Sequence, residues 1–338
     1  AIWPRCWGIR SGYGGGSDGR QSVCDLAIVI VSYNVRDLLR TCLRSIERAG
    51  GSQDLAETVA TEATSKQSVD VWVVDNGSTD GSVELVREEF PRVNLREPGE
   101  NVGFSRANNL ALREIISDEP GHEIPRYILL LNPDTELPLA ALAELVSFMD
   151  AHAVVGAVGP KLVQSDGSLD LACRRSFPTP EVAFYRLTGL SRLFPRSRRF
   201  GRYNLTYLDP DGVAEVDSVV GACMLVRSEV VRAVGLLDES FFMYGEDLDW
   251  SLRIKQAGWK VMYNGRTVVF HHKRASSSQR SVQSLLAFYQ AMLIFFQKHY
   301  AQQTVWPVRW LIVGAIYWRA GLAILFTGRG RSRTTIDG

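Results

Sequence analysis

The chain has 338 residues, a formal net charge of +1, and a composition that is 46% hydrophobic and 22% charged. This length fits one large domain or a domain with an appendage, and the apolar content supports a core of normal size, which excludes a globally disordered chain. The near-zero net charge gives no whole-molecule field of the kind that indicates a nucleic-acid-binding protein.

Residues 1–22 are rich in glycine and arginine and lack the apolar run of a secretory signal, so we expect a flexible leading segment.

After this segment, the first half of the chain alternates between strand-like and helix-like patterns of apolar residues. Apolar runs predict strands at 25–32, 69–74, 127–131 and 154–160, and a short further strand is expected at 93–96. Helical spacing predicts helices at 37–49, 83–90, 101–116 and 139–150. This alternation predicts an α/β fold with a mostly parallel sheet flanked by helices.

The second half changes character. Residues 174–202 combine eight arginines with aromatic residues, and 216–226 is apolar and rich in small residues. An acidic helix start follows at 245–250, then a strand at 261–272 that ends in two histidines, and finally a strongly apolar helical stretch at 281–327. We therefore expect a main α/β domain over residues 23–275 and an apolar helical segment over 276–338.

Polar clusters at 75–80 and 132–136 fall where predicted strands end. In parallel sheets, ligands bind beyond the carboxyl ends of the strands. Asp75 could accept hydrogen bonds from a nucleotide, although an Asx turn explains the same residue. Asn-Pro-Asp at 132–134 is also a sequence that forms turns readily.

Five motifs in order carry a resemblance to a known family: 30–34 (IVSYN), 74–80 (VDNGSTD), 101–105 (NVGFS), 131–134 (LNPD) and 245–250 (GEDLDW). Over roughly residues 25–275, the chain resembles the GT-A fold family 2 glycosyltransferases, and within them the bacterial rhamnosyltransferases of polysaccharide assembly. The resemblance implies a Rossmann-like GT-A domain, a nucleotide-diphosphate-sugar donor (a dTDP- or UDP-sugar), a divalent metal (Mg²⁺ or Mn²⁺) and inversion at the anomeric carbon.

The resemblance also implies roles for particular residues. The donor-binding candidates are Ser32, Asn34, Asp75, Asn101, Gly103, Arg106 and Asn132. The metal-binding candidates are Asp134 and His271; strand alternation allows only one of His271 and His272 to face the site, and we choose His271.

Two acidic residues at a helix start are the catalytic candidates. Asp247 matches the family's general base, and Glu246 would orient it or bind the acceptor. Acidic groups are also stabilised there by the helix dipole alone. Tyr244 and Trp250 are candidates for the acceptor side, although core packing explains Trp250 equally well.

Residues 305–327 raise the question of a membrane. Arg309 and Arg319 argue against a simple span, and the tryptophans are typical of the bilayer interface. We expect amphipathic helices lying on the cytoplasmic face of the cell membrane, peripherally or as a C-terminal anchor, with the arginine-rich stretch facing anionic headgroups or a lipid diphosphate. A packed helical hairpin is the alternative.

The sequence therefore predicts an inverting glycosyltransferase that moves a sugar such as rhamnose to a hydroxyl of a glycan or lipid-linked glycan, with no nucleic-acid partner. Two alternatives stay open at this point. One is a non-catalytic glycan-binding or scaffold protein on the same fold, and the other is a sugar nucleotidyltransferase.

Overall fold

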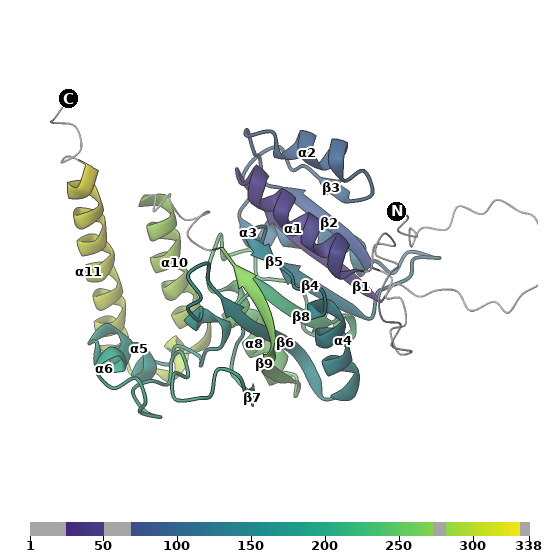
Figure 1. The fold of residues 1–338 in the computed structure, drawn as a ribbon. Helices are drawn as coiled ribbons and strands as arrows, with labels where there is room; N and C mark the ends of the chain where they lie inside the picture. Colours follow the sequence, from purple (N-terminus) through teal and green to yellow (C-terminus); the bar gives the residue numbers. More distant parts are fainter. Residues whose placement is uncertain (1–24, 51–68, 273–281, 332–338) are drawn as a thin grey trace, which may run out of the picture.

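A nine-stranded sheet forms the centre of the computed structural model, which describes residues 25–50, 69–272 and 282–331 (Figure 1). The prediction for residues 1–22 therefore lies outside the described residues. The strands are β1 (Leu26–Ser32), β2 (Val69–Asp75), β3 (Asn94–Arg96), β4 (Tyr127–Leu131), β5 (Thr135–Glu136), β6 (Val155–Val163), β7 (Val213–Glu215), β8 (Cys223–Arg227) and β9 (Lys260–His271). Their order is β3-β2-β1-β4-β8-β6-β9-β5, and β7 pairs with β9.

Helices cover both faces of the sheet, so the predicted α/β class is confirmed (Figure 1). The α-helices are α1 (Arg36–Ala49), α2 (Ser82–Glu89), α3 (Phe104–Ile115), α4 (Ala141–Ala151), α5 (Pro180–Leu187), α6 (Leu190–Leu193), α7 (Ser228–Val234), α8 (Glu246–Gln256), α10 (Val282–His299) and α11 (Trp306–Arg331). Two 3₁₀ turns are η1 (Leu171–Cys173) and η2 (Ala301–Gln303).

The sheet is parallel in its first half and mixed in its second. β3, β2, β1 and β4 run parallel, as the strand–helix alternation predicts. β8 then runs antiparallel between β4 and β6, whereas β6 and β9 are parallel to each other. Because β1 pairs in parallel with both β2 and β4, the carboxyl ends of these three strands meet at one edge, and the predicted polar clusters lie there.

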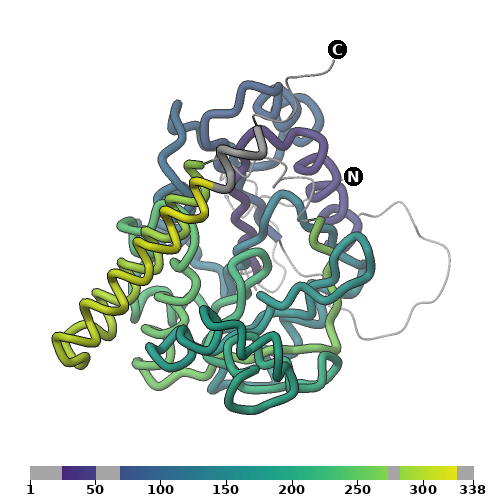
Figure 2. The backbone as a smooth tube through the Cα atoms, turned by 90° about the vertical axis from the view of Figure 1, so that its left-hand side faces the viewer, coloured from purple at the N-terminus to yellow at the C-terminus, as the bar shows by residue number. Residues whose placement is uncertain are grey.

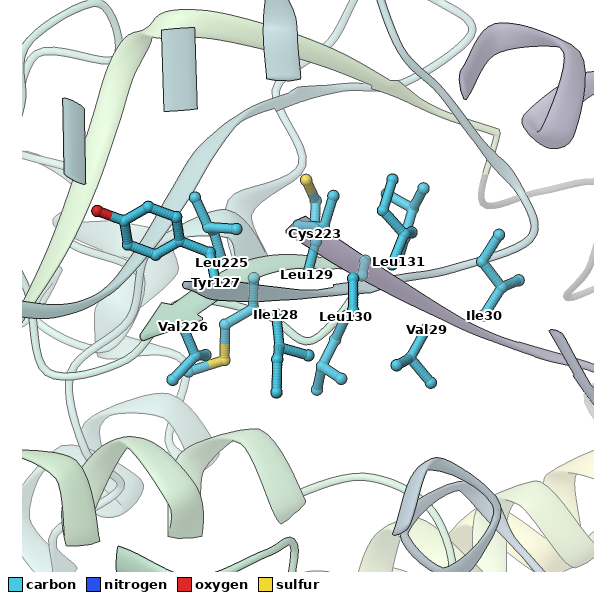
Figure 3. Close-up of a cluster of buried hydrophobic side chains, with 14 of the residues drawn as sticks. Val29, Ile30, Tyr127, Ile128, Leu129, Leu130, Leu131, Cys223, Leu225 and Val226 are labelled. Carbon is cyan, nitrogen blue, oxygen red and sulfur yellow. The ribbon is translucent and has the colours of Figure 1, made fainter. Parts of the chain in front are cut away.

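Strands β1 and β4 are buried along their whole length, which explains their continuous apolar sequences. Figure 3 shows Leu129 and Leu131 on one face of β4, and Ile128 and Leu130 on the other. Both faces are thus covered, and the strand that ends at Asn132 is fixed from two sides.

The C-terminal helices α10 and α11 pack along each other beside the α/β body (Figures 1 and 2). The predicted helical appendage is confirmed in this respect. One long apolar window, Trp306–Leu325, could cross a membrane by length and composition, and only 11% of it is buried. Arg319 Nη1, near the middle of α11, donates to the Leu187 carbonyl at the end of α5 (3.1 Å).

Asp249 joins α8 to α10. Its carboxylate is fully buried, and Arg253 Nε lies 2.8 Å from it, as the i,i+4 spacing predicts. Lys298 and His299 on α10 contact the other oxygen at 2.7 and 2.8 Å. Burial acts to raise the pKa of Asp249, but the hydrogen bonds from His299 and Lys298 and the nearby charges outweigh it and lower the pKa to about 2.

We predict that Asp249→Asn lowers the free energy of unfolding by about 2 kcal/mol at pH 7. A carboxyl whose folded-state pKa is depressed contributes stability above its unfolded pKa and loses that contribution as pH falls. The difference between the variant and the parent should therefore shrink between pH 4 and pH 2. Urea unfolding across this range measures it, with the exposed Asp37→Asn as the matched control. Equal stabilities at pH 7 would show that the cluster contributes nothing.

Candidate active site

Ser32 and Asp75 lie side by side at the ends of β1 and β2. Asp75 Oδ1 accepts a hydrogen bond from the Ser78 N–H (2.8 Å), so the Asx turn is present. Asp75 Oδ2 and Ser32 Oγ are both buried, and neither has a hydrogen-bond partner among the described residues. Since buried polar atoms are normally satisfied, these two are free to bind a polar ligand group.

Asn34 fastens the two strand-end loops to each other. It adopts a left-handed conformation (φ 52°), its N–H donates to Ser78 Oγ (2.9 Å), and its Oδ1 accepts from the Thr79 N–H (2.8 Å). The oxygen of this side chain is thus occupied within the protein. Asn34 therefore shapes the loops that follow β1 and β2. Its direct contact with a sugar donor stays a prediction.

The backbone at the start of α3 lies very close to the segment before α8. Asn101 Oδ1 accepts from Asn76 Nδ2 (2.9 Å) and from the Gly103 N–H (3.1 Å). Gly103 has φ +88°, and a Cβ there would lie 2.7 Å from Phe242, whose carbonyl accepts from the Phe104 N–H (2.7 Å). This contact draws the loop before α8 against α3. Arg106 is exposed on the first turn of α3.

Asp134 and His271 face each other across the end of the sheet. β5 and β9 pair Thr135 with His271, and His271 Nε2 lies 3.3 Å from Asp134 Oδ1. The other ring nitrogen, Nδ1, lies 3.0 Å from Asp170 Oδ2. His272 instead contacts Ser165 Oγ at 2.9 Å. His271, and not His272, is thus the histidine that faces Asp134.

Asp134 and His271 together could hold a cation that also binds a substrate. Among the described residues, no three His, Cys, Asp or Glu side chains converge as a metal cage. One carboxylate and one imidazole would leave positions for diphosphate oxygens and water. A carboxylate shared with substrate phosphates is how Mg²⁺ is commonly held, whereas an imidazole favours a softer divalent ion. A carboxylate behind the histidine, here Asp170, is a typical second partner of such a ligand.

Burial acts to lower the pKa of His271, but the hydrogen bonds to Asp134 and Asp170 outweigh it and raise the pKa to about 9. The pair of carboxylates therefore favours positive charge at this position. A metal cation would satisfy the same demand and would displace the proton.

Asp247 is held from three directions at the start of α8. Its Oδ2 accepts from Arg175 Nη2 (2.7 Å) and from the Gly221 N–H (3.1 Å). Its Oδ1 accepts from the Leu248 N–H (2.7 Å). The side chains of Arg175 and Asp247 are only 10% and 7% exposed, so this is a buried ion pair.

Glu246 has a different environment from its neighbour. Its Oε2 is buried and has no hydrogen-bond partner among the described residues. Burial, and then the charge of Asp247, raise the pKa of Glu246 to about 8, although Arg175 acts in the opposite direction. Two adjacent carboxyl groups thus differ in pairing, which is the usual basis for giving them different chemical roles.

Residues 221 and 222 connect the loop that carries Asp134 with the Asp247 carboxylate. The Asn132 N–H donates to the Ala222 carbonyl (2.9 Å), which fixes the loop that carries Asp134. The neighbouring Gly221 N–H donates to Asp247. Asp134 and Asp247 are therefore held at the same edge of the sheet through two consecutive residues.

Tyr244 and Trp250 differ sharply in position. Tyr244 is 42% exposed, has φ +71°, and packs edge-on against Phe288 of α10 with ring centres 6.0 Å apart. Trp250 is fully buried, and its Nε1 donates to the Gly235 carbonyl (2.9 Å). The prediction that Trp250 contacts an acceptor is wrong, because this ring belongs to the core.

The sequence missed Arg175 and Asp170. Arg175 lies in the arginine-rich stretch that we expected to face a membrane, but it is buried and serves Asp247. Arg174 is buried as well and donates to the carbonyls of Asp209 and Leu208. The surface prediction is therefore wrong for these two arginines. Asp170 belongs to none of the five motifs, so only its contact with His271 identifies it.

Known proteins are similar to this chain in sequence. A family model described as glycosyl transferase family 2 matches residues 27–232. Two proteins of Mycobacterium tuberculosis (strains CDC 1551 / Oshkosh and ATCC 25618 / H37Rv), named N-acetylglucosaminyl-diphospho-decaprenol L-rhamnosyltransferase, are 28% identical over 93% of this chain and 98% of their own length. A low-salt glycan biosynthesis hexosyltransferase of Haloferax volcanii is 25% identical over 69% of this chain and 62% of its own.

Two solved structures share the fold. One is a mannosyltransferase from Pyrobaculum calidifontis in complex with GDP-Man and Mn²⁺ (TM-score 0.52, 17% identity, 97% of this chain and 85% of that one). The other is GalNAc-T7 with UDP, GalNAc and Mn²⁺ (TM-score 0.53, 14% identity, 83% of this chain and 48% of that one). The chain belongs to glycosyl transferase family 2 and is a glycosyltransferase similar to the mycobacterial rhamnosyltransferases.

Proposed function

We propose that this enzyme transfers a sugar, with rhamnose our first choice, from a dTDP- or UDP-sugar to a hydroxyl of a lipid-linked glycan, with inversion. The name of the mycobacterial relatives, which are similar over nearly the whole chain, supports the sugar and the type of acceptor. Family membership supports an enzyme over the scaffold and nucleotidyltransferase alternatives. One observation carries the mechanism: residues 221–222 hold the Asp134 loop and Asp247 at one edge of the sheet.

The donor would lie along the ends of β1, β2 and β4. Ser32 Oγ and Asp75 Oδ2, both buried and unpaired among the described residues, would bind the nucleoside. Arg106 at the start of α3 would face the diphosphate, together with backbone N–H groups of that helix end. Asn34, Asn101, Gly103 and Asn132 would give these loops their shape.

Asp134 and His271 would hold the divalent metal, with Asp170 fixing the orientation of His271. When bound, the metal would neutralise diphosphate charge and stabilise the leaving nucleoside diphosphate.

Asp247 would act as general base on the acceptor hydroxyl. As the proton moves to Asp247, the acceptor oxygen attacks the anomeric carbon from the face opposite the diphosphate, and the bond from that carbon to the phosphate oxygen breaks. Arg175 would keep the Asp247 carboxylate aimed, and a neutral Glu246 would donate a hydrogen bond to the acceptor. Tyr244 would border the acceptor entrance.

The acceptor's lipid would require contact with a membrane, and α11 fits that need. Its large exposed apolar side chains lie within about 200° of the helix circumference at 3.6 residues per turn; they are Trp306, Val308, Trp310, Leu311, Tyr317, Trp318, Leu322 and Leu325. The bond from Arg319 to Leu187 attaches the middle of α11 to the catalytic domain. A helix fastened at its middle is better suited to lie along the cytoplasmic membrane surface than to cross it.

We predict that activity falls as pH rises through about 8, because Glu246 then loses the proton with which it donates to the acceptor. Glu246→Gln keeps a donor and cannot ionise, so it should retain most of the activity and lose this alkaline decline. Asp247→Asn should lower kcat by about 10²–10⁴. The measurement is a pH–rate profile of sugar transfer, with the exposed Asp118→Asn as the control. A wild-type rate that rises through pH 8, together with an inactive Glu246→Gln, would make Glu246 the base.

We also predict that Asp170→Asn raises the Mn²⁺ concentration for half-maximal activity by about 10–100-fold, since Asp170 touches His271 and orients it. Titration of activity with Mn²⁺ measures the shift, and electron paramagnetic resonance of bound Mn²⁺ checks it independently. Asp166→Asn, an exposed carboxylate of the same loop, is the matched control. Identical Mn²⁺ titrations for both variants and the parent would argue against metal binding at His271.

A further inference from the structure

A cavity of about 300 Å³ opens on the arginine-rich surface, separate from the residues assigned above. Its lining consists of Glu181, Val182, Tyr185, Arg198, Arg199 and Arg202. We propose that this cavity binds the phosphate or diphosphate group of a membrane lipid and so holds the headgroup of a lipid-linked acceptor. The acceptor part of this proposal rests on the proposed function, whereas the phosphate site itself does not.

Two of the three arginines that line the cavity have no ion-pair partner among the described residues, so they could bind an anion. Tyr185 Oη donates to Glu181 Oε1 (2.6 Å), and Arg199 Nε lies 2.7 Å from Tyr185 Oη and 3.3 Å from Glu181 Oε1. Arg199 therefore compensates the one acidic side chain. Arg198 and Arg202 are exposed, and neither guanidinium has a hydrogen bond or ion pair with the described residues. Their planar forks match phosphate oxygens, and the volume is that of a small-molecule site.

Hydrogen bonds fix the loop that carries these arginines. Ser197 Oγ accepts from the N–H groups of Arg199 (3.2 Å) and Phe200 (3.3 Å). Thr206 Oγ1 donates to the Pro195 carbonyl and closes the loop. The Phe200 ring packs edge-on against Tyr185, with ring centres 4.9 Å apart. The cavity is thus formed before any ligand arrives, which reduces the entropy cost of binding.

Two hydrogen bonds connect the segments around the cavity to α11 and to the segment that carries Arg175. On one side, the Leu187 carbonyl of α5 accepts a hydrogen bond from Arg319 of α11. The exposed Phe184, Leu193 and Phe194 are close to Leu187 in the sequence. On the other side, the Ser176 N–H donates to the Tyr203 carbonyl (2.8 Å), which joins the neighbour of Arg202 to the neighbour of Arg175. A lipid whose tail enters the bilayer beside α11 would have its phosphates at the cavity and its sugar directed toward Asp247.

Binding to the full chain tests this proposal without any turnover, so it can fail while the transferase function stands. The probes are inorganic pyrophosphate in EDTA, which removes metal-dependent binding, and phosphatidylcholine vesicles that are plain, or contain phosphatidylglycerol, or contain a polyprenyl diphosphate. The variant R198A/R202A removes the two available charges of the cavity. Its matched control, R192A/R196A, removes two exposed charges of the same surface that do not line the cavity.

We expect R198A/R202A to weaken binding of pyrophosphate and of diphosphate-containing vesicles by about tenfold or more, since two charged hydrogen-bond donors are lost. R192A/R196A should change binding by no more than about twofold. A selective loss that extends to phosphatidylglycerol vesicles, but not to plain ones, would also support a phosphate site and would make an anionic headgroup with a single phosphate its ligand. Equal losses in the two variants, or no loss in R198A/R202A, would overturn the proposal. Unchanged melting temperatures exclude misfolding as the cause.

Discussion

The buried ion pair between Arg175 and Asp247 is the interaction on which the proposed active site depends. Its two side chains come from segments 72 residues apart, and the same carboxylate oxygen also binds the Gly221 N–H. Removing one partner of such a pair leaves an uncompensated charge in the protein and costs about 3–5 kcal/mol. The start of α8, the segment before β8 and the residues after η1 are therefore held in one arrangement, with Asp247 at its centre.

Around this fixed point, the polar atoms of the edge divide into two groups. Asn34, Asn76 and Asn101 use their side-chain oxygens to join loops. Ser32 Oγ, Asp75 Oδ2 and Glu246 Oε2 are buried without partners among the described residues. A buried polar atom without a partner costs about 1–3 kcal/mol, and a ligand that supplies the partner recovers that energy as affinity. These three unpaired atoms therefore mark positions where polar groups of a substrate would bind.

Much of the fold could be predicted from the sequence because local pattern determines local structure in this chain. The run at Tyr127–Leu131 is apolar at every position, and β4 is buried on both faces at those residues. The antiparallel direction of β8 could not be predicted, because it depends on pairing with β4 and β6 and not on any periodicity of 223–227. Trp250 shows the same limit, since an aromatic residue next to a motif can face either the site or the core.

The site was predictable only as far as its motifs reach. Asp134 and Asp247 lie in motifs, and His271 ends a strand whose alternation places it toward Asp134. Asp170 and Arg175 act through contacts with residues 101 and 72 positions away, and neither carries a local signal. Arg175 was also misleading, because its stretch has the composition of a membrane-facing surface. Only burial separates Arg174 and Arg175 from the exposed arginines that follow.

We propose that a cation at Asp134 and a general base at Asp247 act together at one edge of the sheet. The most direct measurement is a crystal structure of the protein soaked with Mn²⁺ and a nucleoside diphosphate, with the manganese located by its anomalous scattering. We expect one manganese peak bonded to Asp134 and His271, with the diphosphate beyond it and Asp247 facing the open side. A bound nucleotide whose manganese lies away from both residues would show that Asp134 and His271 do not hold the metal.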